Sequence, residues 1–299
     1  MKKDIRIGDI MRSTRQRVPG TKQRPSFALV GSPVDEGVMR NGGRPGSAEA
    51  PAAIRRHLFK MTPPPDIHDA FIGLVSSATD LGDVARGPME AMQQRLGDMV
   101  APYLEAEVPV IILGGGHETS YGHHLGYRKA GIRHQIINLD AHADVRPLLS
   151  GKGHSGSPFR QVLEDPASGC TGYIAAGLQP HSAAGEHVDF IWQQGGSVHY
   201  YDEVNKTLIE RLYKDRRMKI MATFDMDALD QSVAPGVSAP NPNGLDKSLW
   251  LKAFRMAGEN YSVTSMDLVE VNPVFDRDEH TSRLAALSVW SFLVGLSLR

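Results

Sequence analysis

The stretch QIINLDAHADVRP, residues 135–147, decides the fold because it joins a buried-strand pattern to a chemical motif. Residues 135–139 are nearly continuously apolar, which is typical of a strand covered on both faces in a parallel sheet. Asp140, His142 and Asp144 then follow at every second position, so on an extended backbone they project to one face. In open parallel α/β sheets, ligands bind at the carboxyl ends of the strands. The stretch therefore predicts a strand that carries three candidate metal ligands to the binding edge of a sheet.

Similar strand patterns recur along the chain, separated by helical patterns. The other strand-like runs cover residues 27–31, 109–113, 172–177, 219–224 and 261–268. Helical patterns cover residues 50–60, 89–104, 204–215, 247–258 and 281–296. This alternation predicts an α/β fold with a mostly parallel central sheet and crossover helices. A length of 299 residues suits one domain. We expect it to span residues 26–299, after an N-terminal extension at 1–25.

Composition excludes several classes of partner and site. The net charge of −1 gives no global field to attract nucleic acid or anionic lipid, and no apolar run is long enough to span a bilayer. Cys170 is the single cysteine, so internal disulfides and cysteine-based zinc sites are excluded. The basic N-terminus lacks the apolar run of a signal peptide. We expect a cytoplasmic protein without nucleic-acid or membrane partners.

Polar residues follow other predicted strands as well. His117 ends the motif GGGH, Asp225 and Asp227 lie in FDMD, and Glu270 follows the strand at 261–268. A lone DxD is usually a turn or a solvated strand end, whereas burying all these groups together without a metal would carry a large desolvation penalty. Two histidines and four aspartates suit Mn²⁺ or a related hard divalent ion. Six ligands exceed the need of one ion, so bridging aspartates would hold two.

Three long stretches rich in glycine and proline separate these motifs, at about residues 31–49, 145–160 and 228–246. Long irregular loops in a compact domain are usually functional. We expect them to form walls or lids of the site.

These motifs resemble those of the ureohydrolases, the family of arginases, agmatinases and formimidoylglutamases. The matching segments are DEGVMRNGGRPGSAEAPAAIR (35–55), GGGHETSYG (114–122), DAHADVRP (140–147), SGSPF (155–159), FDMDALDQSVAPGVSAP (224–240) and EVNP (270–273). The resemblance implies a three-layer α/β/α sandwich of the arginase type, a pair of Mn²⁺ ions and a homo-oligomer. It further implies that one ion is bound by His117, Asp140, Asp144 and Asp225, and the other by Asp140, His142, Asp225 and Asp227.

The resemblance also implies a mechanism. A water held between two divalent ions loses a proton near neutral pH, and the bridging hydroxide attacks an amidine-type carbon. Asp144 would help to pass a proton to the leaving amine, and Glu270 would pair with the cationic amidine or guanidine group. Without the resemblance, Glu270 would be interpreted as a strand-end salt bridge.

Departures from the family pattern concern the substrate. Ser155 stands where arginases and agmatinases carry a proton-shuttle histidine, and whether the preceding His154 reaches the site is open. Arg146 stands where arginases carry an asparagine, and its fork can bind a carboxylate at two points, although a solvated surface role is the alternative. Asn41 and Arg44 are weaker candidates for a carboxylate, and for Arg44 a local role in its loop is equally plausible.

These departures, with RNGGRPG, PGVSAP and GGGHE, resemble the formimidoylglutamase branch of the family. We therefore expect Mn²⁺-dependent hydrolysis of N-formimidoyl-L-glutamate, a small amidine with two carboxylates, to L-glutamate and formamide in histidine degradation. One alternative is a hydrolase for another acidic guanidino or amidino compound, which would release urea from a guanidino substrate. Another is a catalytically silent metal-binding relative. His123 and His124 are expected to pack in a helix or to face solvent.

Overall fold

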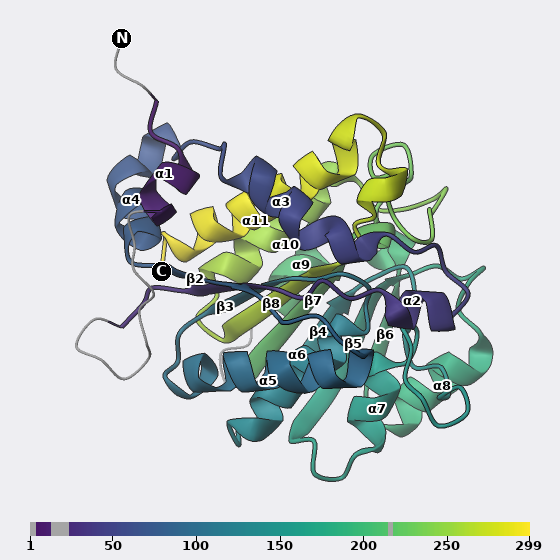
Figure 1. Ribbon diagram of the computed structural model, residues 1–299. Helices are drawn as coiled ribbons and strands as arrows, with labels where there is room; N and C mark the ends of the chain where they lie inside the picture. Colours follow the sequence, from purple (N-terminus) through teal and green to yellow (C-terminus); the bar gives the residue numbers. More distant parts are fainter. Residues whose placement is uncertain (1–3, 13–23, 215–217) are drawn as a thin grey trace.

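The computed structural model describes residues 4–12, 24–214 and 218–299, which build a sheet between two layers of helices (Figure 1). All neighbouring strands of the eight-stranded sheet are parallel, in the order β2-β1-β3-β8-β7-β4-β5-β6. The strands are β1 (Ala28–Gly31), β2 (Thr79–Asp83), β3 (Val110–Leu113), β4 (His134–Leu139), β5 (Cys170–Leu178), β6 (Ser197–Tyr200), β7 (Lys219–Asp225) and β8 (Val263–Val269). The predicted parallel α/β sheet is confirmed.

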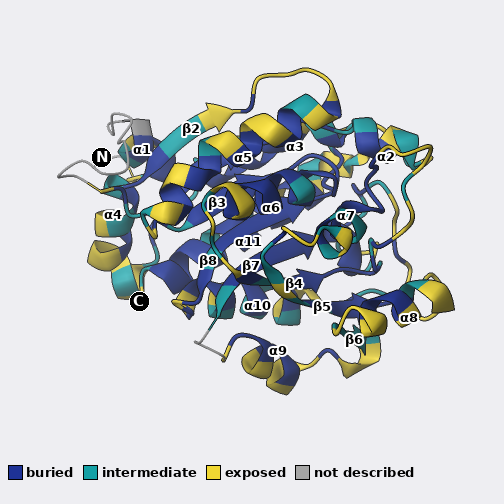
Figure 2. Ribbon diagram, turned by 90° about the horizontal axis from the view of Figure 1, so that it is seen from below, coloured by how far each residue is buried: buried dark blue, intermediate teal, exposed yellow. Residues whose placement is uncertain are grey.

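Helices cover both faces of the sheet (Figures 1 and 2). One layer holds α1 (Ile7–Arg12), α3 (Ala50–Leu58), α4 (His68–Ser76), α9 (Lys206–Leu212), α10 (Lys247–Glu259) and α11 (His280–Leu296). The other holds α5 (Met89–Glu105), α6 (Thr119–Lys129), α7 (Pro158–Glu164) and α8 (Gly185–Gln193). The short helix α2 (Glu36–Arg40) lies outside these two layers, beside the candidate site. The three-layer α/β/α arrangement is therefore confirmed.

Alternation along the strands divides the core into two apolar clusters. Phe224 of β7 faces α10, where its ring stacks on Phe254 with centroids 3.9 Å apart. Met221 of the same strand faces the other layer. This two-sided burial explains why the central strands are apolar at nearly every position. Buried residues accordingly gather on the strands and on the inner sides of α5 and α6 (Figure 2).

The predicted strands and helices are found with small shifts of their ends, but several elements were not predicted. The helix predicted at 204–215 ends at Leu212, and residue 215 lies outside the described residues. Strands β2 and β6 were missed because they are short edge strands of partly exposed, mixed composition. No described helix is long and apolar enough to cross a membrane.

Part of the predicted N-terminal extension packs on the domain. The backbone N–H of Ile7 donates to the carbonyl of Met61, and that of Gly8 donates to the carbonyl of Phe59, both at 3.0 Å. Ile7 and Met11 are buried in the same cluster as α11. Residues 13–23, which belong to the same predicted extension, lie outside the described part of the chain.

Candidate metal centre

Two short turns place the aspartates that follow β4 and β7. The backbone N–H of His142 donates to Asp140 Oδ1 at 2.7 Å, and that of Asp227 donates to Asp225 Oδ1 at 2.8 Å. Each strand end therefore folds into an Asx turn in which the first aspartate accepts from the residue two positions on. The backbone is therefore not extended through residues 140–144, as the alternating pattern predicted, and Asp144 also has a left-handed φ of 48°.

His117 is held at the centre of the first ligand group. The preceding glycines permit a close turn, since a Cβ at Gly115 would lie 1.8 Å from the carbonyl oxygen of Val34. The Nδ1 atom of His117 lies 2.9 Å from Asp144 Oδ2, 2.9 Å from Asp225 Oδ2 and 3.2 Å from Asp140 Oδ2. Three carboxylates thus converge on one ring nitrogen, which nevertheless makes no hydrogen bond of acceptable geometry.

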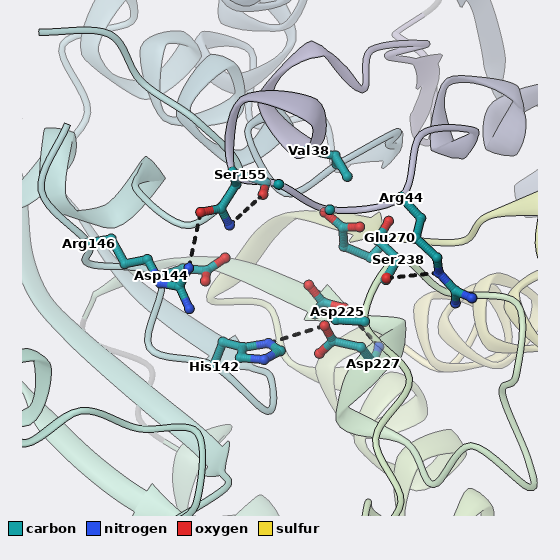
Figure 3. Close-up of a pocket in the computed structure, with 14 residues that line it drawn as sticks. Val38, Arg44, His142, Asp144, Arg146, Ser155, Asp225, Asp227, Ser238 and Glu270 are labelled. Carbon is teal, nitrogen blue, oxygen red and sulfur yellow. Dashed lines mark hydrogen bonds and ion pairs between the residues drawn. The ribbon is translucent and has the colours of Figure 1, made fainter. Parts of the chain in front are cut away.

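A second ligand group shares Asp140 with the first. His142 Nδ1 lies 3.2 Å from Asp227 Oδ2 (Figure 3). The same nitrogen lies 3.5 Å from Asp140 Oδ1. Potential ligand atoms of Asp140, His142 and Asp227 all lie within 4.8 Å of one another. Asp140 therefore belongs to both groups, as predicted for a bridging ligand. Asp225 belongs here only to the first group, so its bridging role stays a prediction.

The burial and charge of these residues fit divalent cations. His117 Nδ1 and Asp227 Oδ1 are buried and have no hydrogen-bond partner among the described residues. Burial lowers the pKa of His117, but the carboxylates of Asp140, Asp144 and Asp225 raise it well above its ordinary value. Burial, with the charges of Asp227 and Asp140, raises the pKa of Asp225 well above its usual range. So many buried acidic groups require cations or protons, and a mixed nitrogen and oxygen set suits hard divalent ions.

Glu270 is a buried carboxylate beside the metal ligands. Its Oε1 accepts the backbone N–H of His117 at 2.8 Å, while Oε2 is buried without a partner among the described residues. Burial, together with the charge of Asp227, raises the pKa of Glu270 to about 7, although the neighbouring Ser238 hydroxyl opposes this shift. Its backbone φ of 65° is left-handed, a strained state that clusters at functional sites. Glu270 forms no ion pair with any described residue. The alternative interpretation of Glu270 as a strand-end salt bridge is therefore not supported.

A cavity of about 280 Å³ opens onto both ligand groups. The three predicted loops all contribute to its wall, and the lining residues include Val38, Asn41, Arg44, Arg146, Ser155 and Ser238. The expectation that these loops form walls of the site is confirmed. Arg146 lies on the side of Asp144, whereas Arg44 lies on the side of Ser238 and Glu270 (Figure 3).

Arg146 is oriented by the first loop. Its Nη1 donates to Asn41 Oδ1 at 3.1 Å, and Asn41 Nδ2 donates to Ser155 Oγ at 3.2 Å. Arg146 is exposed at the cavity and forms no ion pair among the residues that the structure covers. Its guanidinium is therefore available to an anion that enters the cavity.

Arg44 and His154 have local partners instead. Arg44 donates to the backbone carbonyls of Val237 and Ser238 at 2.5 and 3.2 Å, and its guanidinium lies 4.2 Å from the ring centroid of Phe275. These contacts favour the local structural interpretation for Arg44. His154 Nε2 lies 3.1 Å from the carbonyl of Pro147, and the residue does not line the cavity.

Known proteins with a similar sequence or a similar fold identify the family of this chain. The sequence model of the arginase family matches residues 25–295. The chain belongs to the arginase family. Among family members, a formimidoylglutamase of Geobacillus thermodenitrificans is 36% identical over 279 residues, covering 90% of this chain and 84% of that protein. A formimidoylglutamase of Streptococcus pyogenes is 32% identical, covering 88% and 83% of the two chains. The crystal structure of Trypanosoma cruzi formiminoglutamase with Mn²⁺ superimposes with a TM-score of 0.88 at 27% identity, covering 99% of this arginase-family chain and all of the other.

Sequence reasoning missed the polar residues that lie behind the ligands. Glu118, directly after His117, is fully buried and accepts the backbone N–H of Gly37 at 2.7 Å. Burial and the charge of Glu270 raise the pKa of Glu118 to about 8. Asp267 and Thr223 are also fully buried, in the middle of β8 and β7. The sequence carried a signal for Asp267, because this carboxylate lies inside the apolar run VTSMDLV. A charged group in such a run is rarely buried without partners.

Proposed function

We propose that this chain is a Mn²⁺-dependent formimidoylglutamase that hydrolyses N-formimidoyl-L-glutamate to L-glutamate and formamide. One observation carries the proposal: a single cavity offers Glu270, whose Oε2 has no partner among the described residues, and Arg146, which forms no ion pair among them, on either side of the candidate metal ligands. A substrate that carries both an amidine cation and carboxylates complements this pair. The relatives named formimidoylglutamase, at 32–37% identity, support the same conclusion.

Glu270 would bind the amidine end of the substrate. Its Oε2 is buried without a partner, and a planar cationic amidine offers forked N–H donors to such an oxygen. Because the pKa of Glu270 is raised to about 7, the cation would bind best where Glu270 is ionised, above that pH. Binding would hold the reacting carbon beside the two ligand groups.

Arg146 would bind a carboxylate at the other end. Asn41 holds one guanidinium nitrogen, which leaves the remaining donors free for the substrate. Ser155 anchors Asn41 and lines the same wall, so both residues would shape the carboxylate subsite. A substrate with an ammonium at this end, such as a simple amine, would be repelled by the same charge.

The two ligand groups would each hold one Mn²⁺ ion. Bound ions of this kind polarise the substrate and acidify a water for attack. The water adds to the formimidoyl carbon, the bond from that carbon to the glutamate nitrogen breaks, and the leaving nitrogen takes up a proton. Asp144 is the carboxylate of the first group with the most exposed side chain, at 11% against 0% for Asp140 and 3% for Asp225. Asp144 would therefore carry the proton to the leaving amine, since Ser155 replaces the imidazole found there in other branches.

Further inferences concern the domain bounds, the assembly, the location and the metabolic role of the protein. We infer a single domain over residues 26–299 with an extension at 1–25, a homo-oligomeric cytoplasmic protein, and a role in histidine degradation. Nothing in the composition favours nucleic-acid or membrane partners.

A product assay tests the proposed reaction. Protein loaded with Mn²⁺ is incubated with N-formimidoyl-L-glutamate, and formamide and glutamate are measured by NMR, with Glu270→Gln as the inactive control. Turnover that gives equal amounts of both products supports the proposal. Urea release from a guanidino acid, with no formamide from the formimidoyl substrate, would favour the second candidate, which uses the same Glu270 and Arg146. Bound metal without turnover of either substrate would favour the silent relative.

A further inference from the structure

We propose that Asp267, a carboxylate buried beneath α6, fixes the orientation of the metal ligand His117 through the hydroxyls of Ser120 and Thr223. Asp267 is then a positioning residue, which touches neither substrate nor metal. The inference deepens the proposed function because it concerns the same metal centre.

The fold brings the four residues together at one place. Thr223 and Asp267 are direct neighbours in the parallel register of β7 and β8. Ser120 lies in the first turn of α6, three residues after His117, and packs over these strands. Thr223, Ser120 and Asp267 are 0% exposed, so water cannot substitute for any member of the relay.

The hydrogen bonds form a continuous directed chain. His117 Nε2 lies 3.0 Å from Thr223 Oγ1, which lies 3.2 Å from Ser120 Oγ, and Ser120 donates to Asp267 Oδ2 at 2.9 Å. An ionised carboxylate only accepts, so the donor sequence runs from His117 through Thr223 and Ser120 to Asp267. The proton on His117 is thereby held on Nε2. Its Nδ1 lone pair is left facing the three carboxylates of the first ligand group.

Asp267 is also contacted by a second residue of α6, one turn after Ser120. His123 Nδ1 lies 2.8 Å from the same Oδ2 atom, and His123 Nε2 lies 2.6 Å from Ser265 Oγ. His123, expected from the sequence only to pack or to face solvent, is therefore a fully buried partner of a carboxylate. Burying such a pair is costly, and a stable buried polar network fixes geometry in return.

The contribution of such a relay to the metal centre is measurable. A metal-binding histidine is usually oriented by a residue that hydrogen-bonds its other ring nitrogen. Removing that residue typically weakens metal binding by about 10- to 100-fold. Phe159 also contacts the His117 ring edge-on, with centroids 5.3 Å apart, but its ring cannot accept a conventional hydrogen bond or choose the tautomer. The tautomer therefore depends on Thr223 and, through Ser120, on Asp267.

The test measures Mn²⁺ binding by calorimetric titration and by electron paramagnetic resonance, independently of substrate. Thr223→Val, which removes the hydroxyl at nearly constant volume, is expected to weaken binding at one of the two sites by about 10- to 100-fold. The spectrum should change from two coupled ions to one isolated ion. Thr223→Ser should restore both, and Asp267→Asn should weaken the same site. The matched control is Ser288→Ala, which removes an equally buried hydroxyl that accepts the Trp250 Nε1–H outside this network and should leave both sites unchanged.

If Thr223→Val and Asp267→Asn are folded and bind Mn²⁺ at both sites with wild-type affinity, the proposed relay is wrong. An equal loss in Ser288→Ala would also overturn it, because the effect would then follow from the loss of any buried hydroxyl. Near-ultraviolet circular dichroism establishes that each variant is folded, and if Asp267→Asn is not, the pair Thr223→Val and Thr223→Ser decides alone. A failed product assay would reject the proposed substrate but leave these metal affinities as they are measured.

Discussion

At the scale of single residues, Arg146 is proposed to separate substrates that the metal centre would treat alike. It reaches the cavity from the loop after the ligand Asp144, and Asn41 holds it from a loop more than 100 positions earlier in the chain. A guanidinium at this position favours a carboxylate over an ammonium by charge and by its forked donors. Under the proposed function, chemistry and selectivity would thus reside on neighbouring but different side chains.

Arg146→Ala should weaken substrate recognition without removing the metals. Loss of a charge-assisted hydrogen bond corresponds to roughly 1.5–3 kcal/mol, or about a 10- to 150-fold lower kcat/KM. The loss is expected mainly in KM, with unchanged Mn²⁺ content by elemental analysis. Arg277→Ala, which removes a surface arginine 91% exposed in its side chain, is the matched control. Equal kinetics for Arg146→Ala and wild type would contradict the carboxylate contact.

Residue patterns predicted which side chains would be ligands, but not how they converge. The spacing of Asp140, His142 and Asp144 pointed to metal, since acidic and imidazole groups rarely follow a buried strand so closely. Their convergence depends on Asx turns and on a left-handed φ, which the alternating pattern does not encode. Asp267 was missed because its partner Ser120 is 147 positions away in the sequence.

At the scale of elements, the packing of α6 against β4 depends on buried, uncharged histidines. His124 Nδ1 lies 3.2 Å from His134 Nε2, and the His134 ring stacks on Tyr127 with centroids 4.3 Å apart. Burial, with the proximity of His134, lowers the pKa of His124 to about 2, and burial lowers that of His134 to about 4. Both rings are therefore neutral at neutral pH.

The His134 shift predicts loss of stability in acid. Its pKa is lower in the folded state than in the unfolded state, so the unfolded chain binds more protons between about pH 6.5 and 4. Stability is present above pH 6.5 and falls as the pH decreases toward 4, by up to about 3 kcal/mol from this group. His134→Gln should flatten this part of the curve in urea unfolding with chelator present throughout, whereas the exposed His68→Gln should not. Parallel curves for His134→Gln and wild type would refute the assignment.

Elements in the middle of the sheet were predicted better than those at its edges. Strands β4, β7 and β8 are covered on both faces, so their apolar runs are unambiguous. Strands β2 and β6 have one neighbour each and carry exposed or partly exposed side chains, which weakens the pattern. Short helices such as α7 depend on contacts made by the folded loops, and local propensity does not reveal them.

At the scale of the whole molecule, the candidate metal centre joins the ends of several strands. Candidate ligands lie at or just after the ends of β3, β4 and β7, so bound ions would link three of the eight strands, and Glu270 follows β8 beside them. A cation that binds the folded chain and not the unfolded one stabilises the fold. The stability of the protein should therefore depend on divalent metal.

Removing metal should lower the melting temperature, and adding Mn²⁺ should restore it. One site at 100 times its Kd contributes about 2.7 kcal/mol. Because the pKa values of His117 and His142 are raised by neighbouring carboxylates, binding must release protons, and the stabilisation should grow as the pH rises. Differential scanning fluorimetry at several pH values checks this, with Asp227→Ala expected to give a smaller shift. A melting temperature unaffected by chelator or Mn²⁺ would count against a metal centre.

The candidate metal ligands and the proposed substrate-binding residues lie on different parts of the fold, which has a consequence for protein engineering. The metal ligands follow directly on a rigid sheet, whereas Arg146, Asn41 and Ser155 belong to irregular segments that meet at the cavity wall. Replacing these segments by the corresponding segments of another branch of the family would redesign the substrate pocket and leave the reaction chemistry in place. Because Asn41 of the first segment contacts both Arg146 and Ser155 of the second, segments 31–49 and 145–160 must be exchanged as a matched pair.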